Sequence, residues 1–355
     1  MPNILSCCQA QDKEDPTEEL KKYFLHLAKA IDEEKIDLKH INELLCNGAD
    51  INVQDGKGKT PLHEVAKCWH PDVAKFMLDN NADVNKRDQD GFTPLHTAAA
   101  EDYKEMVEYL LSDRAEITRS IVTVASAYNA SQVLCFLRHK GVEMNILDLR
   151  EAARGGAVDT CTFLIETVGI AVNEGDKDGV CPLHLAAMMN HVDVLELLIN
   201  KKACISAKTT CCQYSALFFA AANDATETLA ILVKKGADIH QRDCKGRTPL
   251  MVAAQRGCSN TCSFLLTKGA QTDLIDPNGE PCIVTILTKV PGVAFNALDK
   301  FYKEDIGNRR RYFYLNNVEP NQPGSYYGYS YGALFVCMHA CMRTCMDAWT
   351  HVWFT

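Results

Sequence analysis

A six-residue motif recurs along this chain at an interval of about 33 residues, and no other feature limits the fold as strongly. The motif reads Gly-x-Thr-Pro-Leu-His at 58–63 and again at 91–96, so that Thr60 and Thr93 lie 33 residues apart. Related copies follow at 179–184, 213–218 and 246–251. Self-similarity at such a period is typical of solenoids, in which each repeat packs only on its neighbours. The sequence therefore predicts a stacked array.

Each motif predicts the start of a helix. Thr60 can accept a hydrogen bond from a free backbone N–H, and Pro61 occupies the first helical position, where its missing N–H costs nothing. A second amphipathic segment follows, as at 105–111, and a glycine such as Gly236 supplies the left-handed conformation that ends it. The segment 48–56 is typical of a projecting hairpin. Each repeat is thus expected to be a helix-turn-helix unit with a β-hairpin finger.

These motifs resemble those of ankyrin repeats, and the resemblance implies an all-α ankyrin-repeat solenoid that binds other proteins. Between Thr93 and Cys181 there are 88 residues, which we interpret as two shortened, degenerate repeats at about 117–178. An unconventional first repeat is expected from residue 20, and an imperfect last copy lies at 279–287. The predicted divisions are an N-terminal extension (1–19), an array of roughly eight repeats (20–300), a junction segment (301–320) and an irregular tail (321–355).

The composition argues against several classes of protein. A formal net charge of -9 and a pI of about 5.7 disfavour nucleic-acid binding, which needs a basic face. The N-terminus shows no secretory signal, so the 17 cysteines are expected to be reduced thiols in a cytoplasmic protein. Charged and histidine residues interrupt the apolar stretch 332–353, and no membrane span is expected there. Cys7 and Cys8 are candidate acylation sites, although the myristoylation signal is missing.

One motif on its own would suggest an enzyme. Residues 328–332 match the Gly-x-Ser-x-Gly nucleophile elbow, with Ser330 as the nucleophile and Asp347 and His351 following in hydrolase order. That elbow requires a strand–turn–helix at an α/β sheet, whereas the preceding chain predicts helical repeats. We therefore expect a Gly/Tyr-rich loop here, and we predict no enzyme, no catalytic residue and no cofactor.

Two groups of cysteine and histidine residues invite a metal interpretation. Cys337, Cys341 and Cys345 recur every four residues with His339 between them, but structural zinc usually needs a second short-spaced pair, which is not apparent. Free thiols in the tail are expected instead. The ankyrin resemblance implies that three histidines at one motif position bond the neighbouring hairpin backbone: His63, His96 and His184. No metal site is predicted.

Aspartates and cysteines in the predicted fingers suggest two further roles. The aspartates are Asp50, Asp55, Asp83, Asp88, Asp90, Asp176, Asp178, Asp238 and Asp243. None fits a twelve-residue calcium loop, but together they would present an acidic edge to a basic partner segment. Cys181 at a helix-capping position, and Cys211 and Cys212 in a finger, are candidate reactive thiols, an idea that burial would exclude.

The segment after the array resembles the junction between the ankyrin repeats and the membrane-proximal region of ankyrin-type transient receptor potential channels, in particular the pyrexia-like branch. The matching segments are 297–301 and 311–315. The resemblance implies a cytosolic regulatory region of a cation channel, with full-length channel subunits as partners in a homo- or hetero-oligomer. Because no pore helices follow, a truncated, spliced or incomplete product is expected. The alternative is a free cytosolic ankyrin adaptor, and no partner-binding residue is singled out.

Overall fold

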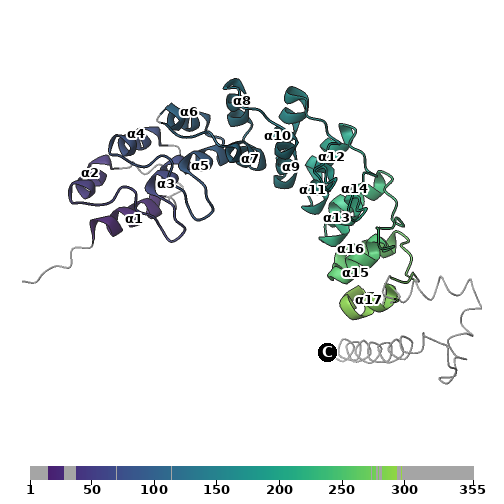
Figure 1. Cartoon of the computed structure of the whole chain (residues 1–355). Coiled ribbons are helices and arrows are strands. Elements are labelled where there is room, and N and C mark those ends of the chain that lie inside the picture. The colour runs from purple at the N-terminus through teal and green to yellow at the C-terminus, as the bar shows by residue number, and fades with distance from the viewer. Residues whose placement is uncertain are drawn as a thin grey trace, which may run out of the picture. The chain divides into compact units, whose positions relative to one another are not determined.

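The computed structural model describes residues 15–27, 37–68, 70–112, 114–272, 274–276, 279, 282–293 and 297. Within these residues the chain is all-α, as predicted. It contains 17 α-helices, one π-helix (η1) and one 3-10 helix (η2), without any β-strand. The chain divides into two compact units, unit 1 at residues 1–170 and unit 2 at residues 171–355 (Figure 1).

Unit 1 contains five helix pairs, one pair for each repeat. They are α1 (Pro16–Leu27) with α2 (Leu38–Cys46), α3 (Pro61–Lys67) with α4 (Pro71–Asp79), α5 (Pro94–Ala100) with α6 (Lys104–Ser112), α7 (Arg119–Ala127) with α8 (Ser131–His139), and α9 (Ile146–Gly155) with α10 (Val158–Phe163) and η1 (Leu164–Val168). The first helices pack in one row, from α3 through α5 and α7 to α9. The motif residues Leu62 and Leu95 are buried in this row, so the core runs along the stack.

Unit 2 contains three further helix pairs, followed by the first helix of one more repeat. They are α11 (Pro182–Met188) with α12 (Val192–Asn200), α13 (Ala216–Ala222) with α14 (Thr226–Lys234), α15 (Pro249–Arg256) with α16 (Ser259–Thr267), and α17 (Cys282–Lys289) followed by η2 (Pro291–Val293). The row α11, α13, α15 and α17 is again continuous, and α12, α14 and α16 form the second row. The eight pairs of the two units agree with the prediction of roughly eight repeats.

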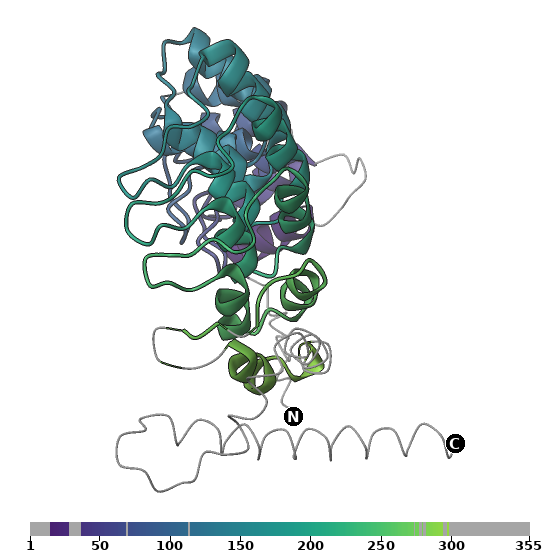
Figure 2. The same ribbon diagram turned by 90° about the vertical axis from the view of Figure 1, so that its right-hand side faces the viewer.

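The fingers are hairpin turns, which in the described residues lack the strands expected for a β-hairpin. They lie between consecutive repeats, and in unit 2 they project from one side of the helices (Figure 2). Two backbone bonds close such a turn. Asp88 N–H bonds Phe92 C=O at 2.8 Å and Gly91 N–H bonds Asp88 C=O at 3.1 Å, and the bonds from Asp243 to Arg247 and from Gly246 to Asp243 are equivalent, at 3.0 and 2.9 Å. One further bond joins neighbouring fingers, as from Gln89 N–H to Lys57 C=O at 3.0 Å. These few bonds do not form the longer ladder of a strand.

Two connections within the predicted degenerate region lack a finger. The segments 113–118 and 140–145 replace the longer connections, such as 47–60, that join the regular repeats. There the guanidinium of Arg119 bonds the buried carboxylate of Asp148 and the Glu143 carbonyl. A side-chain ion pair therefore ties the two shortened repeats together where fingers would otherwise meet.

An Asp or Asn at the turn between the two helices of a repeat connects it to the next repeat. These residues adopt left-handed backbone angles, which Asn and Asp tolerate better than other side chains: Asp102 (φ 58°), Asn129 (φ 61°), Asn190 (φ 60°) and Asp224 (φ 54°). The Asn190 side chain accepts a bond from Thr228 N–H at 3.1 Å, and Asp224 accepts one from Thr261 N–H at 2.8 Å. The turn residue thereby satisfies a free N–H at the start of a neighbouring helix.

Candidate protein-binding surface

The three motif histidines are part of the scaffold. The Nδ1 atom of His63 accepts from the Thr60 N–H at 3.1 Å, while Nε2 donates to the Phe92 carbonyl of the next finger at 3.0 Å. His184 makes the equivalent bonds to Cys181 and to Ala207. Burial lowers the pKa of both rings, so they are neutral at pH 7 and hold the tautomer that these bonds require. His63 and His184 therefore bond the neighbouring finger, as expected from the sequence, whereas the prediction is wrong for His96, whose Nε2 atom lies 2.8 Å from the Ser120 hydroxyl.

Two of the nine finger aspartates are buried and do not contribute to the expected acidic edge, whereas five are exposed: Asp50, Asp83, Asp90, Asp178 and Asp238. Asp243 Oδ1 accepts from the backbone N–H groups of Lys245 and Arg247 at 2.9 and 2.7 Å, and Asp88 makes the same pair of bonds in its own finger. Both are buried. The same turn bonds engage Asp55 and Asp176, while three others accept from the N–H two residues ahead: Asp50, Asp83 and Asp238. These carboxylates fold the fingers.

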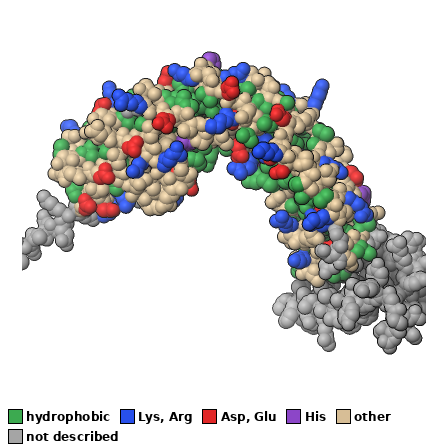
Figure 3. Space-filling model, viewed as in Figure 1, with side chains coloured by type: hydrophobic (Ala, Val, Ile, Leu, Met, Phe, Trp, Pro, Cys, Tyr) green, Lys and Arg blue, Asp and Glu red, His purple; other side chains and the backbone are tan. Residues whose placement is uncertain are grey.

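The fingers of unit 2 expose cations as well as the carboxylates of Asp178 and Asp238. We define the basic finger surface as Lys208 in finger 201–215, Arg242 and Lys245 in finger 235–248, and Arg256 at the end of α15, all four of which are exposed. The two fingers touch through the Cys244 N–H, which bonds the Cys212 carbonyl at 3.0 Å. Several Lys and Arg side chains of unit 2 are visible in Figure 3. The surface stands out in a chain whose net charge is -9.

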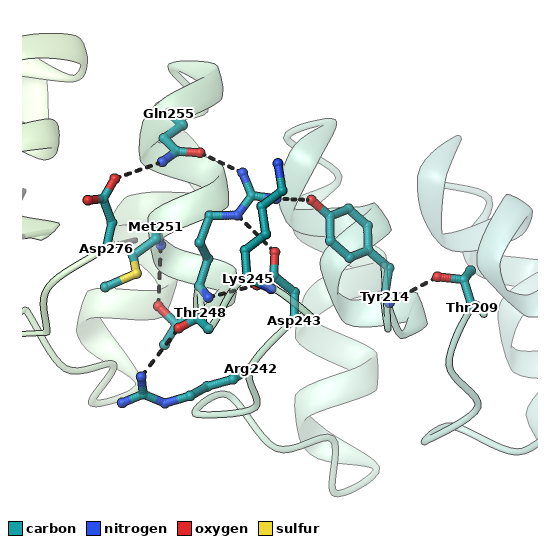
Figure 4. A network of polar contacts seen from close by, with 11 residues as sticks. Thr209, Tyr214, Arg242, Asp243, Lys245, Thr248, Met251, Gln255 and Asp276 are labelled. Atoms are coloured by element: carbon teal, nitrogen blue, oxygen red, sulfur yellow. Dashed lines mark hydrogen bonds and ion pairs between the residues drawn. The ribbon is translucent and has the colours of Figure 1, made fainter. Parts of the chain in front are cut away.

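Arg247 organises this surface by bonding three repeat elements at once (Figure 4). Its Nε atom donates to Asp243 Oδ2 at 2.8 Å, Nη1 donates to Gln255 Oε1 at 2.9 Å, and Nη2 donates to the Tyr214 hydroxyl at 2.7 Å. Gln255 extends the network to Asp276 Oδ2 at 3.4 Å. A planar guanidinium suits such a fixed fork of acceptors. The network therefore fixes the orientation of Tyr214 between the two fingers.

Aromatic and apolar side chains of the first helices adjoin the basic finger surface. The Tyr214 ring stacks on Phe218 with centroids 4.9 Å apart and meets the edge of Phe219 at 6.0 Å. Phe219 also lies against His184. Tyr and Arg are the residue types that most often dominate binding at protein interfaces. This part of unit 2 combines preoriented aromatic contacts with positive charge.

Unit 1 has a groove of a different kind on its second helices. It has a volume of about 770 Å³ and lies over α6, α8, α10 and η1. Phe136 and Phe163 supply apolar area, while Lys104, His139 and Glu166 supply charges or hydrogen-bonding groups of mixed sign. The His139 Nδ1 atom is 2.6 Å from the Cys135 carbonyl of its own helix. This mixed lining favours no particular class of ligand.

The reactive-thiol prediction fails for Cys181. This residue is 3% exposed, and burial raises the pKa of its thiol, so the helix-capping position does not activate it. Cys211 is exposed and Cys212 partly so, and their finger stays a candidate. No group of three His, Cys, Asp or Glu able to hold a metal occurs in the part of the chain that the structure describes.

Several predicted features lie outside the described residues. They are Cys7 and Cys8, the Gly-x-Ser-x-Gly segment with Ser330, Asp347 and His351, the Cys337, Cys341, Cys345 and His339 group, and the channel-like segment 311–315 with all of 297–301 except Ala297. Among the helices that are described, none is long and apolar enough to cross a bilayer.

Sequence reasoning missed the Tyr214–Arg247 contact, although a signal for it existed. Both residues occupy the second position of the recurring motif in consecutive copies, 33 residues apart. Equivalent motif positions in adjacent repeats become spatial neighbours in a solenoid. Aligning the copies by motif position would therefore have placed a tyrosine beside an arginine.

Comparison with known proteins agrees with this architecture. The family model for ankyrin repeats matches three times, over residues 25–121, 122–209 and 202–276. The chain belongs to the ankyrin-repeat family. A fold of this kind is a protein-interaction scaffold, and its specificity is determined by surface residues rather than by the fold.

Curated relatives resemble parts of the chain. A putative palmitoyltransferase ZDHHC13 of Danio rerio is 29% identical over 145 residues, 41% of this chain and 22% of the relative. The transient receptor potential cation channel subfamily A member 1 of Drosophila melanogaster is 29% identical over 127 residues, 34% of this chain and 10% of the channel. Human protein phosphatase 1 regulatory subunit 27 is 43% identical over 54 residues, 15% of this chain and 35% of that subunit. The chain thus spans less than a quarter of the first two relatives.

Proposed function

We propose that this chain binds an acidic segment of a partner protein through the basic finger surface of unit 2 and the adjoining aromatic residues. The observation that carries the proposal is the 2.7 Å bond by which Arg247 holds Tyr214, in a unit whose fingers expose Lys208, Arg242 and Lys245. A tyrosine fixed before binding loses little conformational freedom when a partner packs on it. The partner segment that suits this surface carries Asp or Glu around an aromatic or aliphatic residue.

Charge complementarity determines the class of partner. An acidic segment removes the mutual repulsion of the exposed cations and is attracted from a distance, whereas a basic segment is repelled. Because these charges are exposed, added salt weakens the attraction. We expect association to slow as the ionic strength rises, while contacts to Tyr214 keep a salt-independent part of the affinity.

The experiment selects short peptides from a random library on the immobilised full chain. We expect enrichment of Asp and Glu next to aromatic or aliphatic residues. The triple variant Lys208→Glu, Arg242→Glu and Lys245→Glu should bind the selected peptides about tenfold or more weakly. The matched control reverses three exposed cations of unit 1, Lys57, Arg87 and Arg138. An equal loss of peptide affinity in the triple variant and in the control, or enrichment of basic peptides, would contradict the proposal.

We further propose that the partner assembly is a cation channel of the transient receptor potential type, for which this chain acts as the cytosolic regulatory region. The segments 297–301 and 311–315 and the similarity to the Drosophila channel support this role. A scaffold that binds one channel state better than another shifts the populations of the two states. Full-length channel subunits are then the expected partners.

A free cytosolic adaptor is the second candidate, because similarity of comparable strength extends to the phosphatase regulatory subunit, which is not named as a channel. The two candidate functions are distinguished by tagging the chain at its native locus and identifying the proteins that co-purify from detergent-solubilised membranes and from cytosol. A pore-bearing partner in the membrane fraction supports the channel assembly. Recovery only from cytosol with unrelated partners would leave the adaptor.

A further inference from the structure

Three thiols meet at the tips of two neighbouring fingers in unit 2. Cys211 and Cys212 lie in finger 201–215, and Cys244 lies in finger 235–248. The pKa of the Cys212 thiol is raised, first by its neighbour Cys211 and further by burial and by Cys244 of the next finger. Cys211 and Cys244 are exposed and Cys212 is partly so, and all three are reduced. This cluster takes no part in the helix packing or in the Arg247 network.

The backbone places Cys212 and Cys244 at the separation of a disulfide. The bond from Cys244 N–H to Cys212 C=O measures 3.0 Å, as between adjacent strands, whose chains lie about 5 Å apart. Disulfides join residues whose Cα atoms are roughly 4.4–6.8 Å apart. Equivalent bonds join Gln89 to Lys57 and Thr210 to Asp178 in other finger pairs, and none of these four bonded residues is a cysteine. The 212–244 pair is thus distinguished by its side chains, not by its backbone.

We propose that Cys212 and Cys244 form a reversible disulfide when the protein meets a mild oxidant such as hydrogen peroxide. The thiolate of the exposed Cys244 attacks one peroxide oxygen, the O–O bond breaks, and the second oxygen leaves as water after taking a proton. The resulting sulfenic acid is attacked by the Cys212 sulfur, which releases a second water and forms the S–S bond. Two thiols are oxidised, one peroxide is reduced, and a dithiol reverses the reaction by exchange.

The surroundings favour this pair over the other cysteines. Cys244 is exposed at the turn of its finger, where an oxidant in solution can reach its sulfur. By contrast, burial raises the pKa of Cys161 and of Cys262 to about 12, which keeps both as unreactive thiols. The neighbouring pair Cys211 and Cys212 is a poorer alternative, because a bond between adjacent residues closes a small ring around a peptide that prefers to be planar and trans.

A cross-link at this place joins the two fingers that carry Lys208 and Lys245. Resting on the proposed function, we infer that oxidation changes the affinity of unit 2 for its acidic segment, because the link fixes the relative positions of these cations. The formation of the disulfide itself does not depend on any partner. An experiment can therefore refute the disulfide, or refute its effect on binding, without refuting the other.

Peptide mapping of the full chain tests the cross-link. The reduced protein is treated with hydrogen peroxide, free thiols are blocked, and the sample is digested with trypsin without reduction. Cleavage after Lys208 and Lys234 releases the peptide with Cys211 and Cys212, and cleavage after Arg242 and Lys245 releases Asp243-Cys244-Lys245. We expect these two peptides joined, with a mass about 2 Da below their sum, and separated again by dithiothreitol.

Variants assign the link and provide controls. It should be lost in Cys212→Ser and Cys244→Ser, and kept in Cys211→Ser and in Cys204→Ser, which removes an exposed thiol elsewhere in the same finger. A link confined to Cys211 and Cys212, links only between molecules, or thiols that all stay reduced would overturn the proposal. For the regulatory consequence, the affinity for a selected acidic peptide should change at least about threefold on oxidation of the wild type and stay constant in Cys244→Ser. An unchanged wild-type affinity would refute that consequence alone.

Discussion

The fingers of the two units share one turn but expose different side chains. In both, a buried aspartate accepts two backbone N–H groups, as Asp88 does in unit 1 and Asp243 in unit 2. The exposed positions at the turn of finger 80–93 include Arg87 and Asp90, of opposite charge. The turn of finger 235–248 exposes Arg242 and Lys245, and its exposed carboxylate, Asp238, lies earlier in the finger. Turn geometry therefore depends on the buried carboxylate, and the exposed positions are available for partner recognition.

Arginine in the motif adds a contact that unit 1 lacks. The second motif position is Phe92 in finger 80–93 and Arg247 in finger 235–248. Phe92 stacks on His96 of its own repeat, with centroids 5.6 Å apart, whereas Arg247 bonds across to Tyr214 of the preceding repeat. The same motif position thus serves packing within one repeat in unit 1 and coupling between repeats in unit 2.

The largest effect that we expect comes from removing the turn carboxylate. Asp243→Ala leaves two backbone N–H groups and the Arg247 guanidinium without their acceptor, and should lower the free energy of unfolding by about 3–4 kcal/mol. Asp88→Ala removes the two N–H bonds alone and should cost about 2 kcal/mol. Urea denaturation of the full chain, followed by hydrogen exchange in each unit, measures both changes.

A double-mutant cycle isolates the contribution of the ion pair. If Asp243 and Arg247 stabilise the finger together, Asp243→Ala should cost clearly less when Arg247 is already alanine. Equal costs of the aspartate change in the two backgrounds, or equal effects of Asp88→Ala and Asp243→Ala, would show that the two fingers are energetically alike.

Much of the fold was predictable because its determinants are local in sequence. The Thr-Pro pair specifies a helix start at Pro61 and Pro94, and the regular period places these helices side by side. The direction of the finger carboxylates was not predictable, because a solvated aspartate and one folded back onto its own turn have the same sequence. The interpretation of Cys181 failed for a related reason: the capping position suggested activation, while the stacking of repeats buries the thiol.

The second prediction concerns His96, which faces a shortened repeat. Its Nε2 atom lies 2.8 Å from the Ser120 hydroxyl, whereas His63 and His184 each reach a backbone carbonyl. Burial lowers the pKa of His96 to about 4, and the carbonyl that partly offsets burial at His63 is replaced by a hydroxyl. The missing finger thus leaves this ring more difficult to protonate.

The sign of the pH effect follows from proton binding. Below about pH 6.5 the unfolded chain protonates His96 while the folded chain does so only near pH 4, so the unfolded state binds more protons in this window and stability falls as the pH falls. Between pH 6.5 and 4.5 this residue should account for about 2 kcal/mol. His96→Gln should flatten the decline measured by urea denaturation at several pH values. A decline as steep as in the wild type would exclude His96 as its source.

The smallest effect tests whether Arg247 stabilises unit 2 through Tyr214 or only orients it. Tyr214→Phe keeps the stacking on Phe218 and removes the hydroxyl that accepts the 2.7 Å bond from Arg247. We expect a loss of about 1 kcal/mol in the free energy of unfolding, because the partly exposed guanidinium can bond water instead. The affinity for a selected acidic peptide should fall more than this loss of stability would suggest, since the ring is then free to turn. If stability falls but peptide affinity stays constant, the contact serves only to stack the repeats, as Phe92 does in unit 1.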